Sequence, residues 1–428
     1  MQNTVDRASV KHALDTVIDP ELKKPITELG MVSDVKYKDD NVVEIHINLT
    51  VATCPLKNTI KDDVIKTVSK VKDVRKVTVI LGVMNADQRK AMREKLAGAN
   101  NAYKNNPFTK PGNTTKIYAI SSGKGGVGKS SITANLAIAL SQKGLKIGVM
   151  DADIYGFSIP RILGVKNEPQ TVDSMIIPPV VNGIKVMSIG MFVPPSQAVI
   201  WRGPMLHRAL QQFLNDVYWG DIDILLIDLP PGTGDIAISI AQLLPKSEII
   251  VVTTPQIVAA EVSGRTGAIG HQTNQKVVGV IENMSYLIDT AGAKIELFGR
   301  GGGKYVSKQL SNILGYDVPL LAQIPIDIRL RTASDQGKPI MYVANIDPIA
   351  TENNTFNNKE NFAFEEKNIT QHSQESIQKP KNTCDKSEKL NQNSEVILQI
   401  NKIATYLSKL KRGLSHKKLS ITVKDTGL

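Results

Sequence analysis

The sequence is poor in cysteine and has no long hydrophobic run. Only Cys54 and Cys384 occur among its 428 residues, which excludes a disulfide framework and favours the reducing cytoplasm. The most apolar stretches, such as residues 222–229 and 248–252, have the length of a strand and are too short to span a membrane. Residues 1–6 carry neither a basic nor an apolar segment, so we predict no signal peptide.

Acidic residues are fewer than basic ones, and the formal net charge is +11. A surplus of this kind indicates either a nucleic-acid partner or simply a basic composition. No RNA- or DNA-binding motif accompanies the charge, and the histidines show no metal-ligand spacing. We therefore expect no nucleic-acid partner.

The chain is long enough for two or three domains, and we place the first at residues 1–85. Apolar residues recur at helical spacing between residues 10 and 17, alternate as in a half-buried strand between 43 and 49, and form a closing strand at 74–81. This order predicts a small α+β domain. Residues 86–115, which end in a polar run marked by Pro and Gly, are predicted to be a linker.

The largest domain is expected at residues 116–346, where strands alternate with helices. Several strands are continuous runs of valine and isoleucine, which is typical of strands buried on both faces. Alternation of this kind predicts an α/β fold with a doubly wound, mostly parallel sheet. The predicted strands lie at residues 117–121, 145–150, 185–189, 222–228, 249–253, 277–282 and 319–324.

The remainder of the chain changes composition twice. Residues 347–393 are rich in Asn, Gln, Lys, Glu and Ser with few aliphatic side chains, so we predict a disordered insertion. Residues 394–428 are predicted to form a last helix and a basic tail. The apolar stripe of that helix, which includes Val396, Ile400 and Ile403, fits either an interfacial membrane anchor or a helix that packs on the core. We favour packing, and so expect no membrane partner.

A glycine-rich loop carries the strongest functional signal. It reads Gly123-Lys124-Gly125-Gly126-Val127-Gly128-Lys129-Ser130, and it fits G-x-x-x-x-G-K-[ST] between a predicted strand and an apolar helix. Such a loop aims backbone N–H groups at phosphate oxygens, and the helix N-terminus adds its positive dipole. Lys129 is predicted to reach the β- and γ-phosphates and Ser130 to bind Mg²⁺, with Ser131 beside them in the nucleotide site. A glycine-rich turn with a chance lysine is the alternative, which the flanking elements disfavour.

Acidic residues end two of the predicted strands. Asp151 and Asp153 follow the strand at 145–150, and Asp228 ends the strand at 222–228. Open α/β sheets bind ligands at this carboxyl edge, and Mg²⁺ needs few carboxylates beside phosphate oxygens. We assign Asp228 and Asp151 to the Mg²⁺ site, and one of Asp151 and Asp153, with Asp153 favoured, to orienting the attacking water. Helix capping is the alternative for each acid.

Several runs of this core resemble the Mrp/ApbC family of iron–sulfur cluster carrier ATPases. The resemblance covers about residues 116–346, and related positioning ATPases that resemble MinD or ParA lack the Pro-Pro-Gly-Thr-Gly-Asp string. The runs are Asp151-Ala-Asp-Ile-Tyr-Gly-Phe-Ser158, Trp201-Arg-Gly-Pro-Met205, Asp228-Leu-Pro-Pro-Gly-Thr-Gly-Asp235, Glu282-Asn-Met-Ser285, Phe298-Gly-Arg-Gly-Gly-Gly303 and Ile324-Pro-Ile-Asp327.

This resemblance implies more than the loop spacing does. The string GKGGVGKS resembles the deviant Walker A motif, in which the lysine at position 124 contacts phosphate across a nucleotide-sandwich homodimer. An exposed solubilising charge is the alternative for Lys124. The resemblance also implies that Asn283 and residues 325–327 line the adenine of ATP, although turn residues would look the same.

The N-terminal domain has a resemblance of its own. Asp19-Pro20-Glu21, Leu29-Gly30 and Thr53-Cys54-Pro55 resemble the small SufT/PaaD-like domain of iron–sulfur assembly factors, which is often fused ahead of such ATPases. Two resemblances in one chain imply one pathway. They point to cluster scaffold proteins and apo iron–sulfur proteins as partners.

The sequence departs from this family in one respect. Members that carry clusters usually have a C-x-x-C after the Glu-Asn-Met-Ser run, whereas residues 285–293 contain no cysteine. Iron–sulfur clusters need soft thiolate ligands. Cys54 precedes Pro55 at a predicted helix start, where a thiol has a lowered pKa, so it is either a cluster ligand or a small buried residue.

Three functions follow as hypotheses. The first is a homodimeric, ATP-hydrolysing carrier that delivers iron–sulfur clusters to apoproteins. The second is a nucleotide-switched scaffold without a cluster of its own, which suits the missing C-x-x-C. The third is a membrane-cycling positioning ATPase resembling MinD or ParA, which depends on the last helix acting as an anchor.

Overall fold

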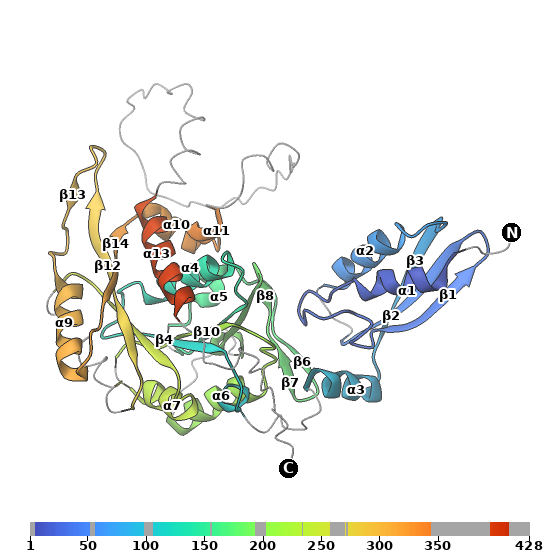
Figure 1. Cartoon of the computed structure of the whole chain (residues 1–428), viewed down its shortest axis with the longest axis horizontal. Helices are drawn as coiled ribbons and strands as arrows, with labels where there is room; N and C mark the ends of the chain where they lie inside the picture. The colour runs from blue at the N-terminus through green and yellow to red at the C-terminus, as the bar shows by residue number, and fades with distance from the viewer. Residues whose placement is uncertain are drawn as a thin grey trace, which may run out of the picture.

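The computed structural model describes residues 5–51, 56–97, 106–154, 156–192, 203–232, 234–256, 270, 273–343 and 394–410. A small N-terminal domain lies at the right of Figure 1 and a larger α/β unit at the left, with helix α3 below their junction. Among the described residues, no helix is both long and apolar enough to cross a membrane. Cys54, Cys384, the predicted disordered insertion and most of the basic tail lie outside these residues.

The N-terminal domain has the predicted order of helix, strand, strand, helix and strand. Its elements are α1 (Arg7–Asp15), β1 (Val32–Lys38), β2 (Val42–Leu49), α2 (Lys57–Val68) and β3 (Lys76–Val83). The sheet has the order β1-β2-β3, with β1 antiparallel and β3 parallel to β2. Because Val43, Ile45 and Ile47 alternate along β2, they face one side and are completely buried in a core shared with both helices.

The segment predicted as a linker at residues 86–115 contains a helix, α3 (Ala86–Ala97), and a 3₁₀ turn at Pro107–Thr109. Asn85 and Gln88 explain where α3 begins. The Asn85 Oδ1 accepts the N–H of Gln88 at 2.8 Å, and the Gln88 Oε1 accepts the N–H of Asn85 at 3.0 Å. This is a reciprocal capping box, which satisfies helix-start donors and stabilises α3 despite its polar composition.

The larger unit is built on a nine-stranded sheet of order β13-β12-β11-β4-β10-β5-β9-β8, with β14 paired to β12. Every pair along the path from β9 through β5, β10, β4, β11 and β12 to β14 is parallel. The doubly wound α/β fold predicted from the alternation of strands and helices is therefore confirmed. The strands are β4 (Lys116–Ser122), β5 (Ile147–Asp151), β8 (Val180–Val181), β9 (Ile184–Ser188), β10 (Ile224–Asp228), β11 (Glu248–Thr253), β12 (Val277–Ile288), β13 (Lys294–Ile295) and β14 (Leu320–Ile326).

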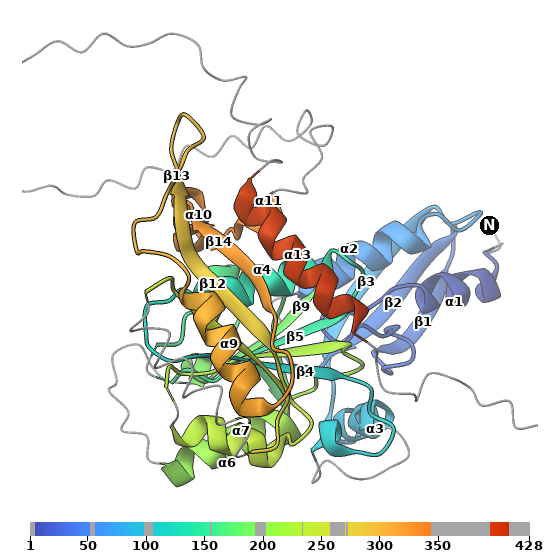
Figure 2. The same cartoon turned by 60° about the vertical axis from the view of Figure 1, so that its left-hand side comes forward.

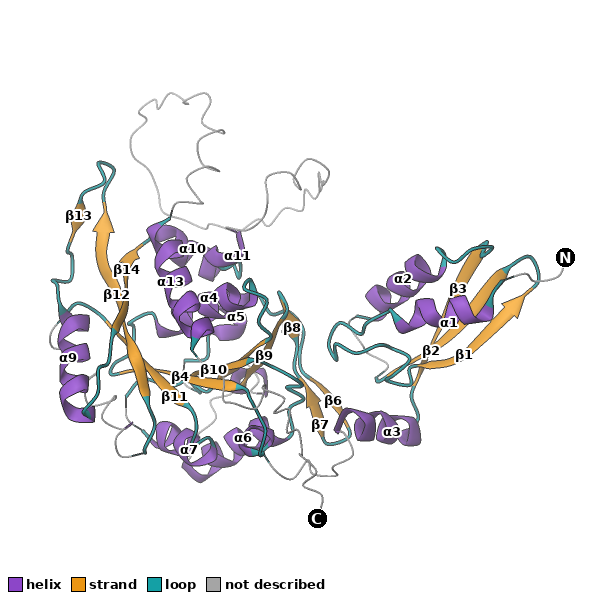
Figure 3. Ribbon diagram, in the orientation of Figure 1, coloured by secondary structure: helices purple, strands orange, loops and turns teal. Residues whose placement is uncertain are grey.

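Helices cover both faces of this sheet, as Figures 1 and 3 show. One face packs against α4 (Lys129–Ser141), α5 (Ile159–Leu163), α11 (Ile340–Val343) and α13 (Glu395–Lys409), with α10 (Ile328–Asp335) beside them. The other packs against α6 (Gly203–Asn215) and α7 (Asp235–Leu243), while α9 (Gly302–Leu314) covers β12.

Helix α13 lies across α4 and β14 in Figure 2. Its apolar stripe, with Val396, Ile400 and Ile403 at most 1% exposed, is part of the main core. Packing, the favoured interpretation of the stripe, is therefore what the structure contains. The stripe is not available as a membrane anchor in this arrangement, because the core already covers it.

A two-stranded ribbon, β6 (Gln170–Val172) and β7 (Met175–Ile177), joins the two units. The side chains of Val172, Met175 and Ile177 are buried in the same core as the N-terminal helices and sheet. Each strand has only three residues, too short to give an alternation that sequence patterning detects. The ribbon nevertheless adds buried side chains to the core of the N-terminal domain.

Candidate functional site

The phosphate loop connects β4 to α4. Gly128 is the N-cap of α4 with φ +79°, and a Cβ there would lie 2.3 Å from the Asn283 Nδ2, so only glycine fits. Gly126 also has φ +79°. Within the described part of the chain, no side chain caps α4. Its first N–H groups therefore remain available to an anion, as the sequence motif requires.

Lys129 and Asp228 form a buried ion pair at the start of α4. The Lys129 Nζ lies 2.7 Å from the Asp228 Oδ2, and the two side chains are 6% and 0% exposed. The Ser130 hydroxyl donates to the same oxygen at 2.6 Å, and the Thr133 hydroxyl donates to the Oδ1 at 2.9 Å. A buried carboxylate needs such donors to stay charged. The lysine and two of the three predicted Mg²⁺ ligands, Ser130 and Asp228, are thus brought together.

Asp151 occupies the neighbouring strand end, opposite Asp228 in the register of β5 and β10. Its Oδ1 accepts the N–H of Asp153 at 3.1 Å, and its Oδ2 accepts the N–H groups of Ser158 and Ile159 at 3.1 and 3.2 Å. Burial, followed by the charge of Asp228, raises the pKa of this carboxyl. Its oxygens accept hydrogen bonds from the backbone of the following loop, and Asp151 is not among the residues that line the cavity described below.

Asp153 lies on that loop and does line the cavity, with 8% of its surface exposed. Its Oδ1 accepts the N–H of Gly156 at 3.0 Å. Its neighbour Tyr155 lies outside the described residues. Of Asp151 and Asp153, Asp153 is therefore the one that lines the cavity together with the phosphate loop.

Lys124 differs from Lys129 in its surroundings. It is exposed, and its Nζ donates to the Gln256 Oε1 at 3.0 Å. Asn283 is buried, and its Nδ2 donates to the carbonyl of Val127 at 2.8 Å, which links β12 to the phosphate loop. Both residues line the cavity, as do Pro325 and Asp327.

The cavity has a volume of about 1330 Å³, which is large enough for a nucleotide. The phosphate loop, Ser131 and Asp153 form one wall, and α10 forms another. Its walls also include residues that the sequence did not single out, among them Arg161, Arg331, Leu330 and Asp335. No sequence signal marks these, because they come from short helices brought in by tertiary packing. Thr133 was also missed, although it follows Lys129 by four residues and so shares its helix face.

The run predicted to lack cluster ligands forms a hairpin. Strand β12 continues through Ile288 beyond its predicted end at residue 282, past an irregularity where Met284 has φ +56°. It then turns back to β13, with the Asp289 Oδ1 accepting the N–H groups of Ala291 and Ala293. Nowhere in the described ranges do three or more His, Cys, Asp or Glu residues gather to hold a metal ion.

Two family models match the chain. Residues 113–359 match a ParA-type family described as NUBPL iron-transfer P-loop NTPase. Residues 7–79 match a family described as iron-sulfur cluster assembly protein. The first match covers the sheet, the cavity and its loop, and the second covers the N-terminal α+β domain.

Curated relatives resemble the chain over most of their length. The chain is 52% identical over 352 residues to an iron-sulfur cluster carrier protein of Mycobacterium leprae, covering 82% of this chain and 92% of the relative. It is 36% identical over 319 residues to one from Bacillus subtilis, covering 74% and 87%. Among solved structures, a nucleotide-binding protein of Archaeoglobus fulgidus in complex with ADP is 36% identical, covers 52% of this chain and 86% of its own, and has a TM-score of 0.45. The chain thus belongs to the NUBPL-type iron-transfer P-loop NTPase family, with an iron–sulfur cluster assembly domain ahead of the NTPase.

Proposed function

We propose that this chain is an ATP-binding and ATP-hydrolysing iron–sulfur cluster carrier that hands clusters to apoproteins. The observation that carries the proposal is the buried constellation of Lys129, Ser130 and Asp228 under an uncapped helix N-terminus. It occurs in a chain whose relatives are named cluster carriers. Nucleotide chemistry and cluster chemistry are then assigned to different parts of the chain.

The nucleotide site fits ATP and Mg²⁺. The Ser130 hydroxyl and the Asp228 carboxylate lie 2.6 Å apart, and both are hard oxygen donors of the kind that Mg²⁺ prefers. When bound there, the ion would neutralise charge on the β- and γ-phosphates. Lys129, already buried at the loop, would turn from Asp228 to the phosphates. Pro325 and Asp327 would border the base.

Asp153 would orient the attacking water, because it is the acid on the cavity wall nearest in sequence to the end of β5. Lys124 is exposed and lines the cavity, and its Nζ donates to the amide oxygen of Gln256. It therefore suits a role in trans, contacting the nucleotide of a second copy in a homodimer. Hydrolysis would separate or reorient the two copies.

The cluster is cargo, and the chain offers few thiols to hold it. Without a C-x-x-C in residues 285–293, Cys54 of the N-terminal domain is the remaining candidate ligand, since Cys384 lies in the segment of disordered composition. Two copies would supply two thiolates. Scaffold proteins and apo iron–sulfur proteins would complete the ligand sets before and after transfer.

Anaerobic reconstitution tests this assignment. The purified chain is incubated with iron and sulfide, and bound iron and sulfide are measured per chain for wild type and Cys54→Ala. Cys384→Ala is the matched control. A cluster on wild type and on the control, but not on Cys54→Ala, supports the carrier. Equal loading of all three variants contradicts a role for Cys54.

A nucleotide-switched scaffold without a cluster is the second candidate function. It is favoured by the missing C-x-x-C in residues 285–293. Failure of wild type to hold any cluster, together with ATP-dependent partner binding that survives in Cys54→Ala, would favour it. Partner binding that disappears with the thiol would exclude it.

A further inference from the structure

Asp151 collects hydrogen bonds from two separate segments of the chain. From the loop after β5, its carboxylate accepts the N–H groups of Asp153, Ser158 and Ile159. From β9, it accepts the hydroxyl of Ser188, whose Oγ lies 3.3 Å from the Oδ2. The Oδ2 is therefore shared by the two segments. A movement of one segment changes the hydrogen bonds available to the other.

These two segments are the ends of a single excursion of the chain, residues 152–188. The first end borders the cavity through Asp153, Ser158 and Arg161. The second end is β9, which pairs with β5 and places Ser188 opposite Asp151. Between them lie α5 and the ribbon of β6 and β7. The excursion thus leaves the nucleotide site, reaches the N-terminal domain and returns to the same carboxylate.

The ribbon is firmly attached to the N-terminal domain. Besides its buried apolar residues, Asp173 at its turn lies 3.6 Å from the Arg89 Nε and 3.7 Å from the Arg93 Nη1 of α3. The Gln170 Nε2 donates to both carboxylate oxygens of Glu21 at 3.3 and 3.2 Å. Glu21 belongs to the Asp19-Pro20-Glu21 turn, a motif for which the nucleotide site gives no role.

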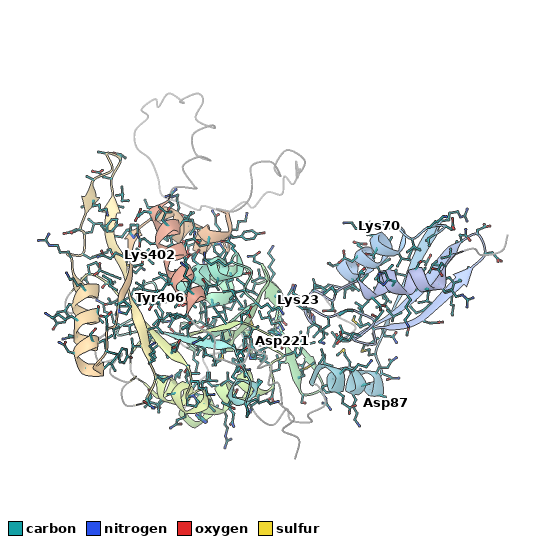
Figure 4. All side chains as sticks on the ribbon, in the orientation of Figure 1. Lys23, Lys70, Asp87, Asp221, Lys402 and Tyr406 are labelled. Atoms are coloured by element: carbon teal, nitrogen blue, oxygen red, sulfur yellow. The ribbon has the colours of Figure 1, made fainter. Side chains whose placement is uncertain are left out.

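Charges also meet where the two units join. Lys23 of the N-terminal domain and Asp221 of the larger unit lie near each other at this junction in Figure 4. Burial lowers the pKa of Lys185 on β9, the strand that carries Ser188; the charge of Lys23 lowers this pKa further and the charge of Asp221 raises it. The second end of the excursion is therefore in electrostatic reach of the N-terminal domain.

We infer that Asp151 is a positioning residue that couples the nucleotide site to the N-terminal domain through the ribbon. The inference rests on the proposed nucleotide binding. A nucleotide that contacts the Asp153 loop shifts the donors on Asp151 and so loosens or tightens β9 and the ribbon. The physical basis is a contiguous set of hydrogen bonds and packed side chains between the two places. The ATPase state would thereby reach the domain that contains Cys54.

Hydrogen exchange on the full chain tests this coupling. Exchange is followed with and without Mg²⁺ and a non-hydrolysable ATP analogue, in peptides that cover residues 153–163, 168–178 and 17–24. In wild type, we expect the analogue to change exchange in all three, by roughly three- to tenfold in the ribbon, the equivalent of one hydrogen bond.

Ser188→Ala separates coupling from binding. It removes the donor from β9 but no residue that lines the cavity, so analogue affinity and the response of residues 153–163 should persist. The response of the ribbon and of residues 17–24 should be lost. Ser247→Ala is the matched control, because Ser247 is equally buried and hydrogen-bonded but lies near β11. Its ribbon response should equal that of wild type.

Asp151→Asn adds a second readout. The side-chain amide of asparagine has one oxygen that accepts hydrogen bonds, so the donors on one of the two Asp151 oxygens lose their acceptor and the loop that contains Asp153 is released as well. We therefore expect kcat to fall more than the affinity for the analogue. Binding of the analogue without any ribbon response in wild type, or a full ribbon response in Ser188→Ala, would overturn the coupling while leaving the ATPase assignment intact. Failure of wild type to bind the analogue would overturn the proposed function, and the coupling with it.

Discussion

Among the described residues, acidic side chains are buried at several places, and two of these places differ in the partners they give the carboxylate. At the carboxyl edge of the large sheet, Asp228 has a lysine and two hydroxyls around its two oxygens. At the contact between the N-terminal domain and the ribbon, Glu21 is 7% exposed and has the neutral amide of Gln170 as its side-chain partner. Burial, followed by the charge of Asp19, raises the pKa of Glu21 to about 7.

The difference shows how burial serves two purposes. A carboxylate surrounded by donors is held in one position, which is what a Mg²⁺ ligand and phosphate site require. A carboxylate buried with a single neutral donor pays a desolvation cost when it ionises. The first arrangement is pre-organised for chemistry, whereas the second makes an interface sensitive to pH.

Removing Lys129 should have the largest effect. Lys129→Ala takes away the cation that is expected to reach the phosphates, and we predict a loss of ATPase activity of at least roughly 100- to 1000-fold. Asp228 keeps Ser130 and Thr133 as donors, so the chain should still fold, with about 3 kcal/mol lower stability. Phosphate release and urea unfolding measure the two effects. Lys143→Ala, at an exposed lysine beyond the same helix, is the control, and full activity in Lys129→Ala would refute the assigned site.

Replacing Lys124 sharpens the contrast, because Lys124 belongs to the same loop as Lys129 but donates to the neutral amide of Gln256 and not to a buried acid. Lys124→Ala should abolish hydrolysis and ATP-driven dimerisation while leaving the stability and nucleotide binding of the single chain nearly unchanged, since the side chain is exposed. Size-exclusion chromatography with a non-hydrolysable analogue reads the dimer, and equilibrium binding reads the nucleotide. Dimerisation at wild-type level would contradict the role in trans.

Removing one of the two hydroxyl groups that donate to Asp228 should have a moderate effect. Thr133→Val keeps the shape of the buried side chain but deletes the donor to the Asp228 Oδ1. We expect about a tenfold lower kcat, with a raised Mg²⁺ requirement and little change in affinity for Mg²⁺-free nucleotide. Thr133→Ser restores the hydroxyl and should restore the Mg²⁺ response. A purely structural role would lower stability in Thr133→Val without changing that response.

Sequence patterns predicted the parts of this protein that depend on local order. The phosphate loop was found because its glycines, Lys129 and Ser130 are contiguous, and the central strands were found because strands buried on both faces are continuous apolar runs. Helix α3 could also have been found, since Asn85 and Gln88 have capping-box spacing.

The remaining features depend on contacts between distant segments. Asp151 and Asp153 are two residues apart and look alike in sequence. Tertiary packing distinguishes them: Asp151 accepts hydrogen bonds from backbone N–H groups, whereas Asp153 lines the cavity. The strand end at residue 282 was predicted too early because Met284 interrupts the pattern while the pairing to β14 continues. The ribbon has no periodicity long enough to detect.

The smallest expected effect concerns Glu21 and is a change in stability with pH. Because the folded pKa of about 7 lies above the ordinary value of 4.5, the stability that protonated Glu21 provides is complete below about pH 4.5 and is lost as the pH rises through 7. Glu21→Gln keeps the shape and cannot ionise, so it should exceed wild type by about 3 kcal/mol at pH 8 and by less than about 1 kcal/mol near pH 5. Urea midpoints of the full chain at both pH values measure the difference, with Glu28→Gln, at an exposed acid of the same domain, as the control. Since Asp19 is retained in every variant, a gain that is equal at both pH values would show that Glu21 is not the titrating group.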